Sequence, residues 1–124
     1  MKIRVYYKDT DSGGITYHSN YLDFCEMTRS ELFFEAGMSP TVDGCHFALK
    51  RIVSDFVTYS KLGDLLEVSS EIKVLKNASF VIYHEIKRGD TLIFRMEATL
   101  VFLCAGGKIG KIPPKYREFF QKFI

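Results

Sequence analysis

Residues 65–77, LLEVSSEIKVLKN, alternate between apolar and polar side chains with a period of two. This alternation predicts a β-strand that turns one face toward a core and the other toward solvent. The inward face holds Leu66, Val68, Ser70, Ile72 and Val74. Further strands are predicted at residues 46–60, 79–88 and 91–104, and the Gly89-Asp90 pair is a strong hairpin signal. Strands that follow one another through short turns pair antiparallel.

Only one long segment has the helical period instead. From about Asn20, apolar residues recur every three or four positions. The recurring set is Tyr21, Phe24, Cys25, Thr28, Leu32 and Ala36. Asn20 with Asp23 resembles a capping box, and Gly37 with Pro40 predicts the end of a helix of ~17 residues, or ~25 Å. A second, short helix is predicted for KYREFFQKF, residues 115–123.

The order of the elements restricts the fold. KIRVYY, residues 2–7, reads as a first strand, so the chain runs strand, long helix and four further strands. Several of these strands exceed the usual five or six residues, and long strands in a twisted sheet curve. The single long helix is the element that can fill the concave face. We therefore predict an α+β fold, a five-stranded curved antiparallel sheet wrapped around one long central helix, in a single domain over residues 1–124.

A sheet of this kind leaves its edges and part of one face apolar. The residues expected to include those covered by a partner subunit are Phe47, Phe56, Ile93, Val101, Leu103, Phe119 and Phe120. Apolar faces and strand edges are commonly buried between identical subunits. We therefore expect a homo-oligomer.

Charge and cysteine content restrict the partners and the compartment. A net charge of +2 with scattered basic residues gives no basis for nucleic-acid binding. The three cysteines, Cys25, Cys45 and Cys104, are odd in number and lack C-x-x-C spacing, which favours reduced thiols over a disulfide framework or a zinc site. The N-terminus does not read as a secretory signal, and no uncharged run approaches the ~20 residues of a membrane span. We expect a cytoplasmic protein.

The loop before the long helix, DTDSGGITYHSNY at residues 9–21, gathers most of the chemistry. Its D-x-D-x-x-G start resembles a calcium loop, but the twelfth position is Asn20 where a bidentate Glu is required. A phosphate-binding loop is excluded because no Lys-Ser/Thr pair follows the glycines. His46 and His84 show no ligand spacing, so no metal site is predicted.

What remains is Asp11 close to a helix N-terminus, where free backbone N–H groups favour negative charge. A carboxylate there can act as a nucleophile or general base, and the same N–H groups can polarise a carbonyl oxygen. Gly13 and Gly14 allow close approach, while His18 and Tyr7 supply further polar groups. These are the parts of acyl-transfer hydrolysis. From the residues alone, the alternative stays open that Asp11 only caps the helix and that Gly-Gly only forms a turn.

The run RVYYKDTDSGGITYHSNYLDFCEMTRSELF closely resembles the opening of hotdog-fold thioesterases of the 4-hydroxybenzoyl-CoA thioesterase family, most of all the Tol–Pal-associated YbgC-type branch. The D-x-D-x-x-G-x-x-Y-H-x-x-Y pattern carries the resemblance, with support from LGDLLEV, from the SF start at Ser79-Phe80 and from GKIGKIP. Ser12 departs from the family, which usually has Ala or Pro after the catalytic Asp. The resemblance implies a dimer, or a tetramer of two dimers, with substrate at the dimer interface.

By match to this motif, Asp11 is the expected catalytic carboxylate, and the His18 backbone N–H is expected to polarise the thioester carbonyl. The resemblance adds the His18 imidazole and Tyr7 as further catalytic groups. It assigns substrate binding to Gly14, Tyr17, Lys76, Asn77 and Ser79, the last three toward the coenzyme A arm.

The implied reaction is hydrolysis of an acyl-CoA thioester to a free acid and coenzyme A, with no metal or redox cofactor. Asp11 either attacks the carbonyl or deprotonates a water. The resemblance extends to peripheral association with envelope or lipid-synthesis proteins. Two alternatives stay open: a hotdog dehydratase acting on acyl thioesters, and a non-catalytic acyl-binding or scaffold protein of the cell envelope. Acyl chain length is not predicted.

Overall fold

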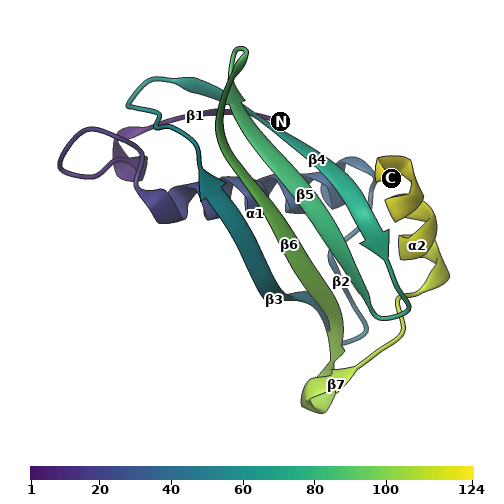
Figure 1. Cartoon of the computed structure of the whole chain (residues 1–124). Helices are drawn as coiled ribbons and strands as arrows, with labels where there is room; N and C mark the ends of the chain where they lie inside the picture. Colours follow the sequence, from purple (N-terminus) through teal and green to yellow (C-terminus); the bar gives the residue numbers. More distant parts are fainter.

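A computed structural model describes residues 1–124 and consists of one twisted sheet packed on one long helix (Figure 1). In chain order the elements are β1 (Lys2–Arg4), the 3-10 turn η1 (Tyr7–Asp9), α1 (His18–Glu35), β2 (Thr41–Val42), β3 (Cys45–Phe56), β4 (Leu65–Leu75), β5 (Ser79–Arg88), β6 (Thr91–Cys104), the 3-10 turn η2 (Ala105–Gly107), β7 (Lys108–Ile109), α2 (Pro114–Phe120) and the 3-10 turn η3 (Gln121–Phe123).

All strands pair antiparallel, in the order β1-β4-β5-β6-β3-β2, with β7 on the end of β6. The predicted α+β class is confirmed, and the four long strands β3 to β6 lie where the alternation predicted them. The sheet has seven strands instead of five because β2 and β7 add two residues each. Such short pairings carry no periodic signal that a sequence reading can detect.

The first strand is shorter than predicted. Residues 2–7 were expected to form it, but β1 ends at Arg4 and Tyr7 opens η1. The cause is tertiary, since the backbone N–H of Tyr6 donates a 2.9 Å hydrogen bond to the Asp9 carboxylate. Local β propensity does not register such a contact.

α1 covers one face of the sheet, and its buried side chains are Tyr21, Phe24, Cys25, Thr28 and Phe33. Four of these five belong to the predicted stripe. The helix ends as predicted, with Gly37 at a φ of 70° that residues with a Cβ rarely adopt. Neither α1 nor α2 is long and apolar enough to cross a bilayer.

Aromatic side chains close the end of the core at which α2 packs. Phe33 of α1 lies 5.0 Å from Phe119 between ring centroids, and Phe80 of β5 lies 4.5 Å from Phe120. Both α2 residues are buried within the single chain. Their expected burial by a partner subunit is therefore wrong, as is that of Ile93, which is fully buried. The C-terminal helix α2 covers this end of the core instead. The sequence predicted the helix but not what it packs against.

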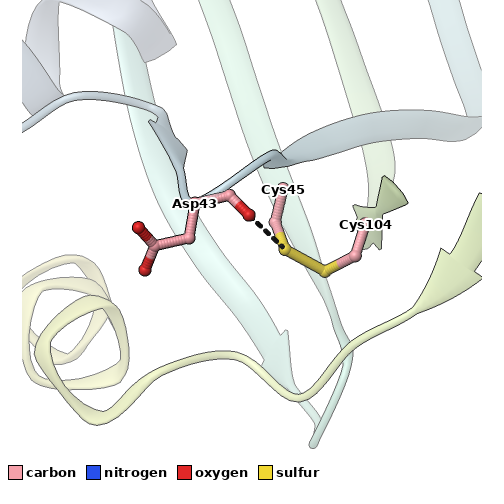
Figure 2. The surroundings of a disulfide bond; sticks show 3 residues. All are labelled: Asp43, Cys45 and Cys104. Carbon is pink, nitrogen blue, oxygen red and sulfur yellow. Dashed lines mark hydrogen bonds between the residues drawn. A yellow bond between two sulfur atoms is a disulfide. The ribbon is translucent and has the colours of Figure 1, made fainter.

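A disulfide joins Cys45, at the start of β3, to Cys104, at the end of β6 (Figure 2). The expectation of reduced thiols is wrong for this pair, whereas Cys25 is a free, buried thiol. Antiparallel pairing of His46 with Leu103 sets the two cysteines opposite each other although 59 residues separate them. Spacing rules do not detect a pair created by strand register.

Candidate active site

Residues 9–17 fold back on themselves as a small antiparallel ribbon in front of α1. The Tyr17 N–H donates to the Asp9 carbonyl at 2.8 Å, Thr10 bridges Thr16, and the Asp11 N–H donates to the Ile15 carbonyl at 2.9 Å. Asp11 therefore lies two residues, roughly 7 Å along the ribbon, from the Asp9–Tyr17 hydrogen bond, which directly precedes the helix. The ribbon brings the predicted carboxylate toward the helix start.

The Asp11 side chain is exposed, and one of its oxygens is held by the loop. The backbone N–H of Gly13 donates a 2.8 Å hydrogen bond to Oδ1. A Cβ at Gly13 would lie 3.2 Å from that oxygen, which explains glycine there as a close approach. Gly14 has a φ of 81°, so its glycine serves the backbone conformation. The second carboxylate oxygen, Oδ2, makes no hydrogen bond and is free to act.

α1 begins without a side-chain cap. Tyr17 occupies the capping position in an extended conformation and offers no side-chain hydrogen bond. The backbone N–H groups of His18 and Ser19 have no acceptor within the chain. Two donors and the positive end of the helix dipole are thus available to a carbonyl or carboxylate oxygen. The predicted capping box of Asn20 and Asp23 is wrong, because Asn20 lies in the first turn of the helix.

Asn20 instead bonds Asp9, a residue to which the sequence reading gave no role. Asp9 is 1% exposed, and its carboxylate accepts hydrogen bonds from the Tyr6 N–H, Lys8 Nζ and Asn20 Nδ2 at 2.9, 2.6 and 3.0 Å. The D-x-D spacing indicates that two carboxylates lie close together, but it does not indicate which of them is buried. Asp9 anchors the loop and Asp11 is the carboxylate left free.

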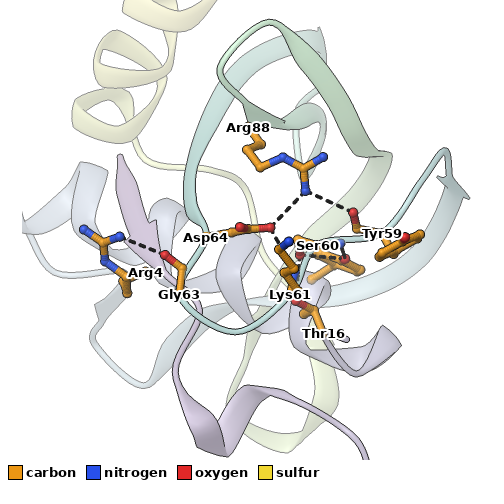
Figure 3. Close-up of polar contacts among 9 residues, drawn as sticks. Arg4, Thr16, Tyr59, Ser60, Lys61, Gly63, Asp64 and Arg88 are labelled. Carbon is orange, nitrogen blue, oxygen red and sulfur yellow. Dashed lines mark hydrogen bonds and ion pairs between the residues drawn. The ribbon is translucent and has the colours of Figure 1, made fainter. Parts of the chain in front are cut away.

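A second buried polar cluster fixes the other side of the ribbon (Figure 3). The Ser60 hydroxyl lies 2.6 Å from the Thr16 hydroxyl and 2.9 Å from the Tyr21 hydroxyl, and the Ser60 N–H donates to Tyr21 at 3.0 Å. All three residues are buried. The neighbouring turn is held by Arg88, which donates to the Asp64 carboxylate at 2.9 Å. The loop that carries Asp11 is therefore bound to α1 and to the β3–β4 connection.

The remaining predicted side chains at this end are exposed. The Tyr17 and His18 rings lie 4.3 Å apart, and His18 meets the Phe56 ring edge-on at 6.3 Å. Tyr7 is 84% exposed, and its hydroxyl makes no hydrogen bond. The structure thus brings Asp11, Gly14 and Tyr17 into one loop that leads into His18, while Tyr7 lies on the adjoining turn η1 and makes no hydrogen bond to Asp11.

Comparison with known proteins gives the family. The thioesterase-like superfamily matches residues 5–120, nearly the whole chain. The chain belongs to this superfamily. It is 44% identical over 86 residues to the acyl-CoA thioesterase YbgC of Helicobacter pylori, which covers 69% of this chain and 65% of that protein. The chain thus spans slightly less than two thirds of that relative.

Two further likenesses cover more of the chain. The acyl-CoA thioesterase YbgC of Haemophilus influenzae is 33% identical over 116 residues, 90% of this chain and 82% of that protein. A 4-hydroxybenzoyl-CoA thioesterase variant solved with 4-hydroxybenzoyl-CoA superposes with a TM-score of 0.87, at 24% identity, over 96% of this chain and 95% of that one. The predicted hotdog fold is thereby confirmed.

Within this thioesterase-like chain, the residues expected at the coenzyme A arm lie far from Asp11. Lys76 and Asn77 form the β4–β5 turn, and Ser79 begins β5. The loop of residues 9–17 bonds residues 60 and 61 before β4 starts, so the 11 residues of β4, roughly 36 Å, separate the two places. One protomer does not bring these two sets together.

No principal cavity of the single thioesterase-like chain opens on the loop. The five main cavities are lined by residues other than Asp11 and His18. No group of three or more His, Cys, Asp or Glu side chains is arranged to hold a metal ion. The candidate site is therefore an exposed loop and helix end that one chain does not enclose.

Proposed function

We propose that the protein hydrolyses acyl-CoA thioesters to a free acid and coenzyme A. The observation that supports this most directly is that Asp11 Oδ2 is free and that the backbone N–H groups of His18 and Ser19, at the start of α1, are unpaired. The thioester carbonyl oxygen accepts from the His18 N–H, which stabilises the negative charge that grows on it. Coenzyme A is part of the substrate, and both chemical roles are filled by protein groups, so the reaction needs no cofactor.

Asp11 has one of two roles in this proposal. It attacks the thioester carbon and forms a transient anhydride, or it removes a proton from an attacking water. Label on Asp11 after turnover in ¹⁸O-labelled water identifies the anhydride route, because only water that opens the anhydride at the enzyme's carbonyl leaves a labelled oxygen there. Mass spectrometry of the Asp11 peptide reads this out.

The experiment that tests the function is thiol release from a panel of short, long and aromatic acyl-CoAs. We expect turnover by the native chain and at least a hundredfold loss of kcat in Asp11→Asn, with an unchanged melting temperature because Asp11 is exposed. His18→Ala keeps the backbone N–H and should lose less. Release of no thiol from any member of the panel would instead support a non-catalytic acyl-binding protein.

The working unit is a dimer, or a pair of dimers, that shares its sites. β3 is bordered on its free side only by the two residues of β2, which pair with Cys45 and His46. From Phe47 to Phe56 that edge has no partner, and Leu49, Val53 and Phe56 are each about half exposed on it. Pairing of two β3 edges would cover these side chains and join the sheets. Lys76, Asn77 and Ser79 then serve a site whose Asp11 belongs to another protomer.

The compartment is the cytoplasm, where acyl-CoA is available, with peripheral association with Tol–Pal or lipid-synthesis proteins of the envelope. The names of the YbgC relatives support this branch of the family. The Cys45–Cys104 disulfide argues in the other direction, since disulfides are rare in the cytoplasm. Cell fractionation combined with alkylation of free thiols tests both points in one experiment.

A further inference from the structure

Arg29 carries a positive charge on the inner side of α1, and no carboxylate forms an ion pair with it. The residue is partly buried, and its one hydrogen bond joins Nη1 to His84 Nε2 at 3.2 Å. None of the five salt bridges includes it. No side-chain nitrogen is both sealed from solvent and unpaired, so the other guanidinium nitrogens are reached through the cavities beside them.

The two buried groups beside Arg29, His84 and Cys25, are neutral, and the exposed Glu26 acts on its charge without forming an ion pair. An arginine only donates, so His84 Nε2 must accept, and Nδ1 carries the proton that faces Ser70 Oγ and the Ser69 carbonyl at 3.0 and 3.2 Å. Burial and the nearby Arg29 charge lower the pKa of His84 to about 3, and burial raises the pKa of the Cys25 thiol to about 12. Neither provides a counter-ion at neutral pH.

A cavity of about 360 Å³ lies between α1 and the β3 edge, and Arg29 forms part of its wall. Apolar wall comes from Phe33, Phe47 and Leu49, among others, and polar wall from Ser30, Thr41 and His46. Glu26 also borders it, as an exposed side chain that forms no ion pair with Arg29. The volume is at the low end of ligand cavities, roughly 300–1,000 Å³, which suits a short acyl group.

We infer that Arg29 binds a carboxylate at the far end of the acyl group, so that the preferred substrates are coenzyme A thioesters of short dicarboxylic acids. This inference rests on the proposed function and specifies its substrate class. A guanidinium matches a carboxylate with two parallel N–H···O bonds. An anionic tail supplies the ion-pair partner that Arg29 lacks within the chain.

The tail and the thioester belong to different protomers. Within one chain, His18 and Arg29 are eleven residues apart on α1, roughly 16 Å, which is long for a short acyl group. In a two-fold antiparallel pairing of the free β3 edges, the Phe56 end of one strand lies opposite the Phe47 end of the other. Phe56 meets His18, and Phe47 lines the Arg29 cavity. The acyl group held at one helix start therefore extends into the other protomer's cavity.

The test compares each dicarboxylic acyl-CoA with the monocarboxylic acyl-CoA of the same carbon number, from five to seven carbons. We expect the native protein to favour the carboxylate-tailed member in kcat/KM by about 10- to 100-fold, the range of one charged hydrogen-bonding contact. Arg29→Gln should bring this ratio of kcat/KM values to about one, and Arg29→Lys should keep part of the preference. Glu26→Gln, which removes a like charge at the same cavity, should raise it.

A native ratio of one or less overturns the inference, and this measurement needs no variant to fold. If every acyl-CoA is inert, the proposed function fails instead. Binding of glutarate and adipate by calorimetry, to the native protein and to Arg29→Gln, then tests the Arg29 site separately. Equal binding to both proteins, or binding to neither, overturns the inference.

Mixed dimers test the division between protomers. A dimer of one Asp11→Asn chain and one Arg29→Gln chain contains one site with both defects and one intact site. Carboxylate-selective turnover should therefore return when the inactive Asp11→Asn variant is mixed with the unselective Arg29→Gln variant. Failure to recover the selectivity in verified heterodimers would contradict a site shared in this way.

Discussion

The side-chain amide of Asn20 donates a 3.0 Å hydrogen bond to Oδ1 of Asp9, which links the first turn of α1 to the buried carboxylate beneath the loop. The Asp9 backbone carbonyl also accepts from the Tyr17 N–H, at the position before the helix. One buried residue thus fixes both the chain direction into α1 and the base of the ribbon that carries Asp11. The free carboxylate depends on the buried one for its position.

Asp9→Asn should therefore destabilise the fold, whereas Asp11→Asn should not. Asp9 accepts three hydrogen bonds at 1% exposure, and an amide would turn an NH₂ group toward one set of donors. We expect a loss of about 2–4 kcal/mol in the free energy of unfolding, measured by urea denaturation. The exposed Asp11→Asn is the control, at less than about 0.5 kcal/mol.

A double-mutant cycle with Asn20→Ala tests the link directly. We expect a coupling of about 1–2 kcal/mol between Asp9→Asn and Asn20→Ala, because the two side chains share one hydrogen bond. Additive effects would show that the contact does not contribute to stability.

The Asp9 case illustrates what the sequence could and could not predict. The alternation over β4, β5 and β6 and the stripe on α1 depend on local period, and these elements lie where expected. The start of the helix does not depend on local period. Asn20 is a residue type that commonly caps helices, but its side chain donates to the carboxylate of Asp9, eleven residues earlier, and the helix begins at His18.

The remaining differences have the same physical origin. Tyr6 and Tyr7 have strand propensity, but the Asp9 carboxylate closes a turn around them. Cys45 and Cys104 meet only because strand register brings them together. The spacing did predict the proximity of Asp11 to the helix start at His18, and the backbone hydrogen bonds of the ribbon show it. The separation of Lys76 from Asp11 depends on the length of β4, and no motif encodes it.

Gly13→Ala should reduce activity more than stability. The new Cβ would lie 3.2 Å from Asp11 Oδ1, which displaces the carboxylate by a few tenths of an ångström. We expect kcat/KM for a good acyl-CoA to fall by about tenfold or more, since misplacement of a reacting group is costly, with only a small change in melting temperature. Gly14→Ala is the matched comparison: its φ of 81° and open surroundings predict a stability loss of about 1–2 kcal/mol instead. Identical profiles for the two variants would contradict the assigned roles.

His84 should make the fold sensitive to mild acid. Burial and the Arg29 charge lower its pKa from 6.5 to about 3, so the folded state resists protonation that the unfolded state accepts. Stability is then complete above pH 6.5 and declines as the pH falls from there toward 3. The slope is about 1.4 kcal/mol per pH unit, which gives a loss of about 2 kcal/mol at pH 5.

The measurement is the free energy of unfolding at pH 7.5 and pH 5 for the native protein and for His84→Gln, which keeps an acceptor for Arg29. Acidic residues titrate in both proteins, so the difference between the two pH dependences isolates His84. We expect His84→Gln to be less stable at pH 7.5 and to lose about 2 kcal/mol less on acidification. Parallel curves would mean that His84 does not titrate in the unfolding transition.

Val53→Lys should separate the proposed dimer without unfolding the chain. Val53 is 52% exposed on the unpaired edge of β3, close to the middle of the free segment from Phe47 to Phe56. With Phe56 opposite Phe47, the two-fold pairing sets the new lysine opposite Lys50 of the partner subunit, and like charges across paired strands repel. We expect sizing with light scattering at micromolar concentration to give a monomer, together with loss of thioesterase turnover, because the shared site is broken. Lys73→Ala, on β4 and away from this edge, is the control and should leave both the mass and the turnover unchanged. A monomeric Val53→Lys protein with full activity would contradict the shared site, and so would a native protein that is an active monomer.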